Sequence, residues 1–131
     1  MVSRLGSPRF LLWAPVVIYM VAIFIGSSIP EPPPIPGGTD KPLHLSAYLG
    51  LAVVVVRAVA GGLPRRIGAG TAAIAIVITV GYGVTDEVHQ MFVPGRLAEV
   101  YDLLADALGA IAGTAACWAW GILWPTSRDE L

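Results

Sequence analysis

Four long apolar runs, separated by short polar segments, make up most of the chain. They predict helices at about 10–29, 43–61, 67–90 and 99–124, the third extending beyond its apolar part, Ile67–Thr85. A helix rises 1.5 Å per residue, so about 20 apolar residues cross the roughly 30 Å hydrocarbon core of a bilayer. Each predicted helix is long enough or nearly so. The pattern therefore predicts an all-α membrane protein, a bundle of four transmembrane helices that forms one domain over residues 1–131.

The composition agrees with a membrane protein. Only 13% of the residues are charged, against about 25% in soluble domains, and the mean hydropathy is +0.74. The few basic residues do not cluster, which excludes a nucleic-acid-binding surface. The single cysteine, Cys117, excludes an internal disulfide and is interpreted as a small packing residue.

The first apolar run could instead be a cleaved signal peptide. Arg4 and Arg9 precede it and small residues, 26–28, follow it. Its apolar part is longer than the roughly 7–15 residues of a signal peptide. We therefore expect the segment to be retained as a transmembrane helix.

The basic residues predict the orientation of the bundle. Six arginines fall at or near one side of the predicted membrane, namely Arg4, Arg9, Arg57, Arg65, Arg66 and Arg128, and only Lys41 and Arg96 fall on the other. Cytoplasmic segments carry the excess of Lys and Arg. Both termini are thus expected in the cytoplasm, with the proline-rich linker at 30–40 outside. The short turn at 92–99 predicts that the third and fourth helices are antiparallel neighbours.

Polar residues gather at the outer ends of three helices with helical spacing. His44 and Tyr48 are four residues apart, and Tyr82, Asp86 and Gln90 repeat every four residues, so each set shares a helix face. Glu87 points about 100° away from Asp86 on the same helix, so the two acids need not share a partner.

The fourth helix carries one stripe that runs from acidic to small residues: Glu99, Asp102, Asp106, Gly109 and Gly113. Asp106 precedes Trp124 by about 27 Å of helix, which places it near the outer edge of the hydrocarbon. The glycines suit close helix approach, and a groove beside them could alternatively admit an acyl or prenyl chain.

Each of these residues also has a structural interpretation. Asp40 and Asp102 fit the start of a helix, Tyr48 and Tyr82 fit an interfacial aromatic belt, and Arg96 fits a solvated turn. Ionisable residues at one depth in a membrane nevertheless favour a functional site. The candidate pocket residues are His44, Asp86, Glu87, Gln90, Arg96, Asp102 and Asp106. The candidate ligand-binding residues are Lys41, Tyr48, Tyr82 and Arg96.

The predicted outer side carries seven acidic residues and only two basic ones. Some carboxylates must therefore be protonated or paired, or a cation must join them. The residues that could supply ligands to a cation are His44, Asp86, Glu87 and His89. Their spacing does not match a zinc signature, so the sequence predicts no metal and no cofactor.

Three segments in this order resemble the VanZ-like family of small bacterial membrane proteins: "DKPLHLSAYLGL", "DEVHQMFVPGR" and "DLLADALGAIAG". The family pattern covers about 40–113 and maps onto Asp40, Lys41, His44, Tyr48, Asp86, Glu87, Gln90, Pro94, Gly95, Arg96 and Asp102. Many members have Asn where this chain has Asp106, so the resemblance implies no carboxylate role there. Through the family's founding member it implies a link to resistance to the glycopeptide teicoplanin.

Two functions remain open at this point. The first is a cell-envelope protein of the plasma membrane whose outward-facing pocket binds or modulates a lipid-linked cell-wall component or a lipoglycopeptide, with Arg96 and Lys41 holding its phosphate or carboxylate. The alternative is an intramembrane hydrolase or transferase for an outer-leaflet phospholipid or polyprenyl phosphate, with His44 and Asp86 or Glu87 as acid–base pair. We favour the first. Membrane lipids are the expected partners, and the oligomeric state is not predicted.

Overall fold

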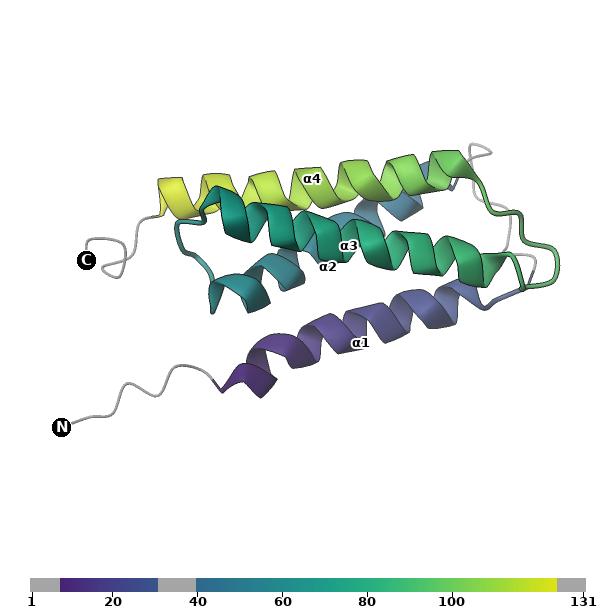
Figure 1. The fold of residues 1–131 in the computed structure, drawn as a ribbon, viewed down its shortest axis with the longest axis horizontal. Helices are drawn as coiled ribbons and strands as arrows, with labels where there is room; N and C mark the ends of the chain where they lie inside the picture. Colours follow the sequence, from purple (N-terminus) through teal and green to yellow (C-terminus); the bar gives the residue numbers. More distant parts are fainter. Residues whose placement is uncertain (1–7, 31–39, 125–131) are drawn as a thin grey trace.

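The computed structural model of the chain describes residues 8–30 and 40–124. Within these ranges it contains no strand and four α-helices, α1 (Arg9–Ser27), α2 (Lys41–Ala60), α3 (Ala69–Gln90) and α4 (Val100–Leu123) (Figure 1). All four are long and apolar enough to cross a membrane. The predicted all-α architecture of four transmembrane helices is therefore confirmed. Most of the proline-rich linker, together with Arg4 and Arg128, lies outside the described residues.

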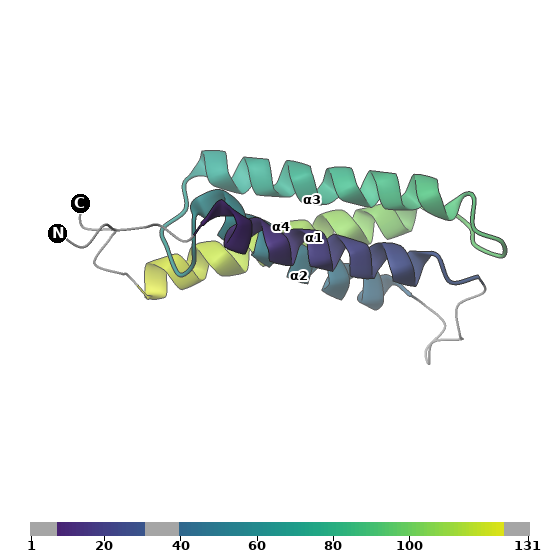
Figure 2. The same cartoon turned by 90° about the horizontal axis from the view of Figure 1, so that it is seen from below.

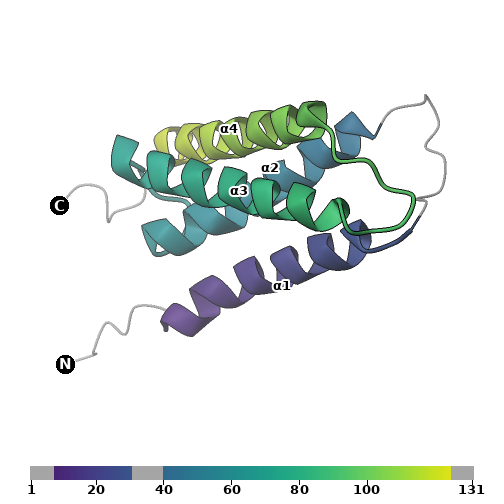
Figure 3. The same ribbon diagram turned by 45° about the vertical axis from the view of Figure 1, so that its right-hand side comes forward.

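The helices form an up-and-down bundle in which α2 is central. It contacts the other three helices and packs most closely against α4. α1 lies against α2 and α3 on the side away from α4, and the described residues of α1 and α4 make no contact (Figures 1 and 3). α3 and α4 are antiparallel neighbours, as predicted (Figure 2). We call the end at which α1 and α3 finish and α2 and α4 begin the polar end.

Two glycines of α4 bring its backbone against that of α2. A Cβ atom on Gly109 would lie 2.9 Å from the Leu49 amide nitrogen and closer still to the Leu45 carbonyl oxygen. A Cβ on Gly113 would lie 2.9 Å from the Ala52 Cβ and closest to the Leu49 carbonyl oxygen. The expected close helix approach is confirmed. A groove for a lipid chain beside these glycines is wrong, because α2 fills that space.

The apolar core lies between α2 and its neighbours, toward the middle of the bundle. Its most buried large side chains include Tyr48, Leu51, Val55, Val56 and Cys117. The cysteine is 2% exposed and packs in this cluster, which confirms its interpretation as a packing residue. Many other large apolar side chains point away from the core, as expected of helices that lipid surrounds.

α1 is attached to the bundle partly through its backbone carbonyls. Pro15 has no N–H group, so the carbonyl of Leu11, four residues earlier, lacks its usual helical donor. The Arg57 guanidinium donates to that oxygen at 3.2 Å. Further along α1, the Tyr82 hydroxyl donates to the Met20 carbonyl oxygen at 2.5 Å. Both bonds fix the position of α1 along its neighbours.

Candidate functional site

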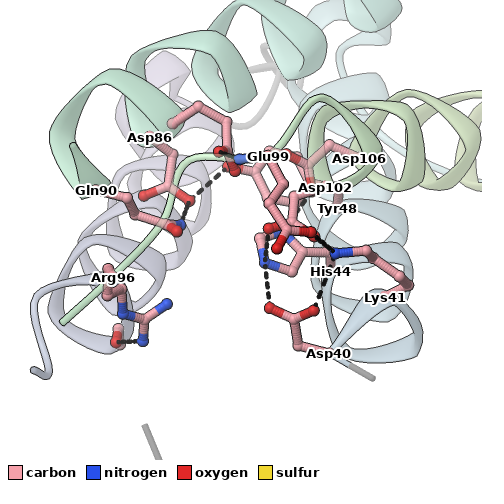
Figure 4. A network of polar contacts seen from close by, with 12 residues as sticks. Asp40, Lys41, His44, Tyr48, Asp86, Gln90, Arg96, Glu99, Asp102 and Asp106 are labelled. Atoms are coloured by element: carbon pink, nitrogen blue, oxygen red, sulfur yellow. Dashed lines mark hydrogen bonds and ion pairs between the residues drawn. The ribbon is translucent and has the colours of Figure 1, made fainter. Parts of the chain in front are cut away.

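The polar end collects most of the ionisable residues that the sequence singled out. α2 supplies Lys41, His44 and Tyr48, α3 supplies Asp86, Glu87 and Gln90, and α4 supplies Asp102 and Asp106 (Figure 4). These residues are buried except Lys41, which is half-buried. The helical spacing explains their convergence, since residues four apart on each helix face the same neighbour. We call this set the polar cluster.

Lys41 is surrounded by carboxylates. Its ammonium donates to Asp40 Oδ1 at 3.2 Å, to Glu99 Oε2 at 2.6 Å, and to the carboxylate of Asp102. Partial burial acts to raise the pKa of Asp40, but the hydrogen bond and charge of Lys41 outweigh it and hold the pKa below its usual 3.8. The positive charge expected to meet a ligand's phosphate is thus shared among three protein carboxylates.

His44 occupies the centre of the polar cluster. Its Nδ1 lies 2.9 Å from Asp106 Oδ1, within hydrogen-bond distance. Its Nε2 faces Asp40 and Asp102 at 3.7 and 3.8 Å, beyond hydrogen-bond distance. The hydrogen-bonded partner of His44 is therefore Asp106, and not Asp86 or Glu87. A histidine oriented by a buried carboxylate is the arrangement that a general base uses.

Asp106 reaches this position because α3 presents a glycine to it. A Cβ on Gly83 would lie 3.0 Å from Asp106 Oδ2 and 3.3 Å from Tyr48 Cε1. With no side chain at Gly83, both groups fit beneath α3. The Asp106 side chain is completely buried, so its carboxylate is not a surface charge.

Asp86 and Glu87 are adjacent in sequence and have different partners, as their angular separation on the helix predicts. Asp86 Oδ2 accepts hydrogen bonds from the Tyr48 hydroxyl and from Gln90 Nε2, each at 3.3 Å. Glu87 Oε2 accepts a bond from the backbone N–H of Glu99 at 3.1 Å. Glu87 therefore joins α3 to the start of α4, whereas Asp86 joins α3 to α2.

Arg96 lies apart from Lys41, on the side of α1 (Figure 4). Its Nε donates to the Ile29 carbonyl oxygen at 3.1 Å and its Nη2 to the Gly26 carbonyl oxygen at 3.0 Å. Pro30 lies four residues after Gly26 and has no N–H to donate to that oxygen. Arg96 thus binds the C-terminal end of α1. Tyr82, expected to contact a ligand, bonds to α1 and does not line the cavity described next.

A cavity of about 440 Å³ lies between α1, α2 and α3 at the polar end. Its apolar lining comes mainly from α1 and α2 and includes Tyr19, Ala22, Ile23, Leu43 and Ala47. Its polar lining comprises His44, Tyr48, Asp86, Gln90 and Arg96, together with Ser27. Five predicted site residues therefore meet in one cavity. The other five lie outside its lining: Lys41, Tyr82, Glu87, Asp102 and Asp106.

Sequence reasoning did not foresee the contribution of α1 to the site. Ser28 Oγ lies 2.9 Å from His89 Nε2, and the Phe24 ring stacks on the His89 ring with centroids 4.3 Å apart. His89 therefore faces α1 and is absent from the groups of potential metal ligands around His44. The small residues at 26–28 are the sequence feature at this end of α1, and from sequence alone they also fit a cleavage site.

The sequence of the whole bundle, from the start of α1 to the end of α4, fits one known family. The family model for VanZ/LLP1 matches residues 10–123. The chain belongs to this family. No curated protein and no solved structure matches it. The resemblance seen in the motifs is therefore confirmed. Together with the four apolar helices, the family match identifies a multi-pass membrane protein of VanZ-like type.

His44 belongs to two groups of residues with the composition of a metal site. One nitrogen of His44 and one oxygen each of Asp40 and Asp102 lie within 4.8 Å of one another, and so do atoms of His44, Glu87 and Asp106. We call these the outer and the inner group. They differ in charge, because the outer group bonds to Lys41, whereas no contact between described residues joins the inner group to Lys41.

Proposed function

We propose that this VanZ-like protein binds an amphiphilic component of the cell envelope in the cavity between α1, α2 and α3. The ligand would be a lipid-linked cell-wall intermediate or a lipoglycopeptide, and binding would modulate its availability. The observation that carries the proposal is the cavity itself. It combines an apolar wall from α1 and α2 with polar side chains from α2, α3 and the turn that follows α3, the two kinds of surface that a molecule with a tail and a polar head requires.

The rim of the cavity supports entry from the membrane. Several lining residues are exposed, among them Ala22 and Gly26 on α1, Ile29 just beyond it, and Leu43 on α2. In a bilayer, exposed apolar residues on the side of a helix bundle contact lipid. An amphiphile would pass this rim sideways, without first leaving the membrane.

The polar lining favours a head group rich in hydroxyl and amide groups. His44, Tyr48 and Gln90 donate and accept hydrogen bonds, and the sugars and peptides of cell-wall intermediates and glycopeptides offer the complementary groups. A bare phosphate is less well suited, because Asp86 is in the lining and Lys41 is occupied by three carboxylates. Arg96 is the basic residue of the lining.

We further propose that the polar end faces outside the plasma membrane and that both termini are cytoplasmic. Among the described residues, four arginines lie toward the opposite end of the bundle, whereas Lys41 and Arg96 are at the polar end; the four are Arg9, Arg57, Arg65 and Arg66. This asymmetry follows the positive-inside rule. A contribution to teicoplanin resistance then requires only that the ligand reach the outer leaflet.

The proposal is tested by filling the cavity. Ala47 is half-buried and lines it, so Ala47→Leu places a larger side chain there. Binding of teicoplanin and of a polyprenyl-linked disaccharide to the protein in lipid nanodiscs is measured by native mass spectrometry. We expect Ala47→Leu to weaken binding of the true ligand at least about tenfold, because the larger side chain occupies cavity space that the ligand would fill.

Ala115→Leu is the matched control. Ala115 is exposed on α4 and does not line the cavity, so the same substitution there should leave binding within about twofold of the wild type. Unchanged binding in Ala47→Leu, with both variants folded, would contradict the proposal. The teicoplanin susceptibility of cells that express each variant supplies the corresponding measurement in vivo.

One observation favours an enzyme as the second candidate. His44 lines the cavity and is held by the buried Asp106 at 2.9 Å, so it is placed to activate water against a bound phospholipid or polyprenyl phosphate. Purified protein is incubated with each lipid, and products are sought by mass spectrometry. Turnover that His44→Ala abolishes would establish the hydrolase or transferase. Binding without turnover would leave the first proposal standing.

A further inference from the structure

We propose that the inner group, His44, Glu87 and Asp106, binds one divalent metal cation. The three residues come from α2, α3 and α4, so they meet only in the folded bundle. A nitrogen of His44 and an oxygen of each acid lie within 4.8 Å of one another. Ligand atoms each bonded to one zinc ion at 2.0–2.2 Å are at most about 4.4 Å apart. The group is therefore near the separation that coordination requires.

Unpartnered oxygen atoms in the same residues point to a missing positive charge. Glu87 Oε1 and Asp106 Oδ2 are buried and have no hydrogen-bond partner among the described residues. Glu87 is 8% exposed and Asp106 is 0% exposed. Ionised carboxylates in such surroundings are strongly destabilised unless they are paired. The described partners of the two acids are His44 Nδ1 for Asp106 and the Glu99 backbone N–H for Glu87. Neither is a lysine or arginine, and with His44 neutral a divalent cation would neutralise both acids.

The outer group is the weaker site because Lys41 already neutralises part of the negative charge of its two acids. Asp40 and Asp102 both bond to the Lys41 ammonium. A metal cation placed between them and His44 would lie next to that ammonium and be repelled by it. The inner group has two acids and, among the described residues, no hydrogen bond or ion pair to a lysine or arginine. Its carboxylates therefore gain more electrostatic stabilisation from a bound cation than those of the outer group.

The geometry also assigns the two histidine nitrogens. Nδ1 is the nitrogen on the side of Asp106, at 2.9 Å from its Oδ1, and would bind the cation in its unprotonated form. Nε2 then carries the proton and faces Asp40 and Asp102 at 3.7 and 3.8 Å. Both distances exceed hydrogen-bond length, so neither acid orients the imidazole, and the inner group does not depend on Asp40. One imidazole and two carboxylates suit zinc or manganese.

The test measures metal binding by the full-length protein in nanodiscs, without any envelope ligand. After treatment with EDTA, the protein is titrated with ZnCl₂ and, separately, with MnCl₂ in a calorimeter. We expect one ion per chain for at least one of the two metals. Glu87→Gln and Asp106→Asn keep the side-chain size and should each weaken binding at least about tenfold. Two variants keep the assignment testable when one of them fails to fold.

Asp40→Asn is the discriminating variant, because Asp40 belongs only to the outer group. We expect its metal affinity to stay within about threefold of the wild type. A loss in Asp40→Asn but not in Glu87→Gln would overturn the inner site. The absence of stoichiometric binding by the wild type would also overturn it, and would mean that protons neutralise the buried acids. Neither result bears on the amphiphile, which the assay does not contain.

Discussion

Replacing Gly109 with alanine is expected to push α2 and α4 apart. The new Cβ would lie 2.9 Å from the Leu49 amide nitrogen and closer to the Leu45 carbonyl oxygen, whereas an ordinary contact begins at 3.4 Å. The helices must therefore separate by at least about 0.5 Å, and backbone atoms cannot turn aside as a side chain can. Overpacking of this kind costs about 1–3 kcal/mol. We expect the free energy of unfolding to fall by about 2 kcal/mol.

The measurement is unfolding of the purified protein in mixed micelles as the fraction of SDS increases. Gly81→Ala is the matched control, since Gly81 lies within α3 and a Cβ there would meet no atom within 4 Å. That variant should be neutral or stabilising by up to about 1 kcal/mol, because alanine favours a helix over glycine. Equal stability of the two variants would refute the inferred backbone contact.

The same reasoning predicts the behaviour of a double variant. Gly113 contacts α2 one turn further along α4, so separation of the two helices by alanine at 109 also makes room at 113. Gly109→Ala and Gly113→Ala together should cost less than the sum of the single changes. The separation also acts one turn from Asp106, and the 2.9 Å contact between His44 and Asp106 should lengthen.

Three further predictions concern the ends and the edges of the bundle. Tyr82→Phe removes the bond to α1 and should lower the free energy of unfolding by about 1 kcal/mol, whereas Tyr101→Phe, on an exposed ring, should change it little. The pKa of Asp40 is lowered in the folded protein, so its ion pairing stabilises the fold above pH about 3.8 and is lost as the pH falls through the folded-state pKa. Because the Asp40 side chain is 40% exposed, its contribution to the free energy of unfolding should be below about 1 kcal/mol. In Asp40→Asn, the free energy of unfolding should therefore fall less between about pH 5 and pH 3 than it does in the wild type. Phe92 is 80% exposed at the polar end, so the cysteine of Phe92→Cys should react with an impermeant thiol reagent in intact cells. The cysteine of Gly68→Cys, at the opposite end, should react only after lysis. The reverse pattern would invert the proposed orientation.

The helices could be predicted because lipid imposes one requirement on every spanning segment. Each must be apolar over about 20 residues, and the four runs meet that requirement without any knowledge of their neighbours. The close pairing of α2 with α4 was also foreseeable in part, since Gly109 and Gly113 on one face indicate close packing. The sequence did not reveal which helix fills that face. The groove considered there is occupied by α2.

The polar cluster was predictable in membership but not in its contacts. Helical spacing placed His44 with Tyr48, and Asp86 with Gln90, because such residues share a face whatever lies opposite. Which acid pairs with which base depends on the rotation of each helix, and spacing carries no information about that rotation. Lys41 therefore looked available to a ligand, yet Glu99 and Asp102, distant in sequence, bond to it. The role of α1 was missed for a similar reason: Arg57, Tyr82 and Arg96 bond to its backbone oxygens, and the contact of His89 with Ser28 depends on how α1 and α3 are rotated.

The attachment of α1 through its carbonyls has a consequence for how the family can diverge. Arg57, Tyr82 and Arg96 bond to oxygen atoms that every residue type possesses. Pro15 and Pro30 remove the N–H four residues after two of these oxygens, the carbonyls of Leu11 and Gly26. Side chains on the cavity-facing side of α1 can therefore change while these bonds persist. The shape of the α1 wall of the cavity can therefore change while the hydrogen bonds that attach α1 to the bundle are kept. If the cavity binds the proposed amphiphile, chimeras that exchange Ala22 and Ile23 between relatives, with the prolines retained, should exchange ligand preference as well.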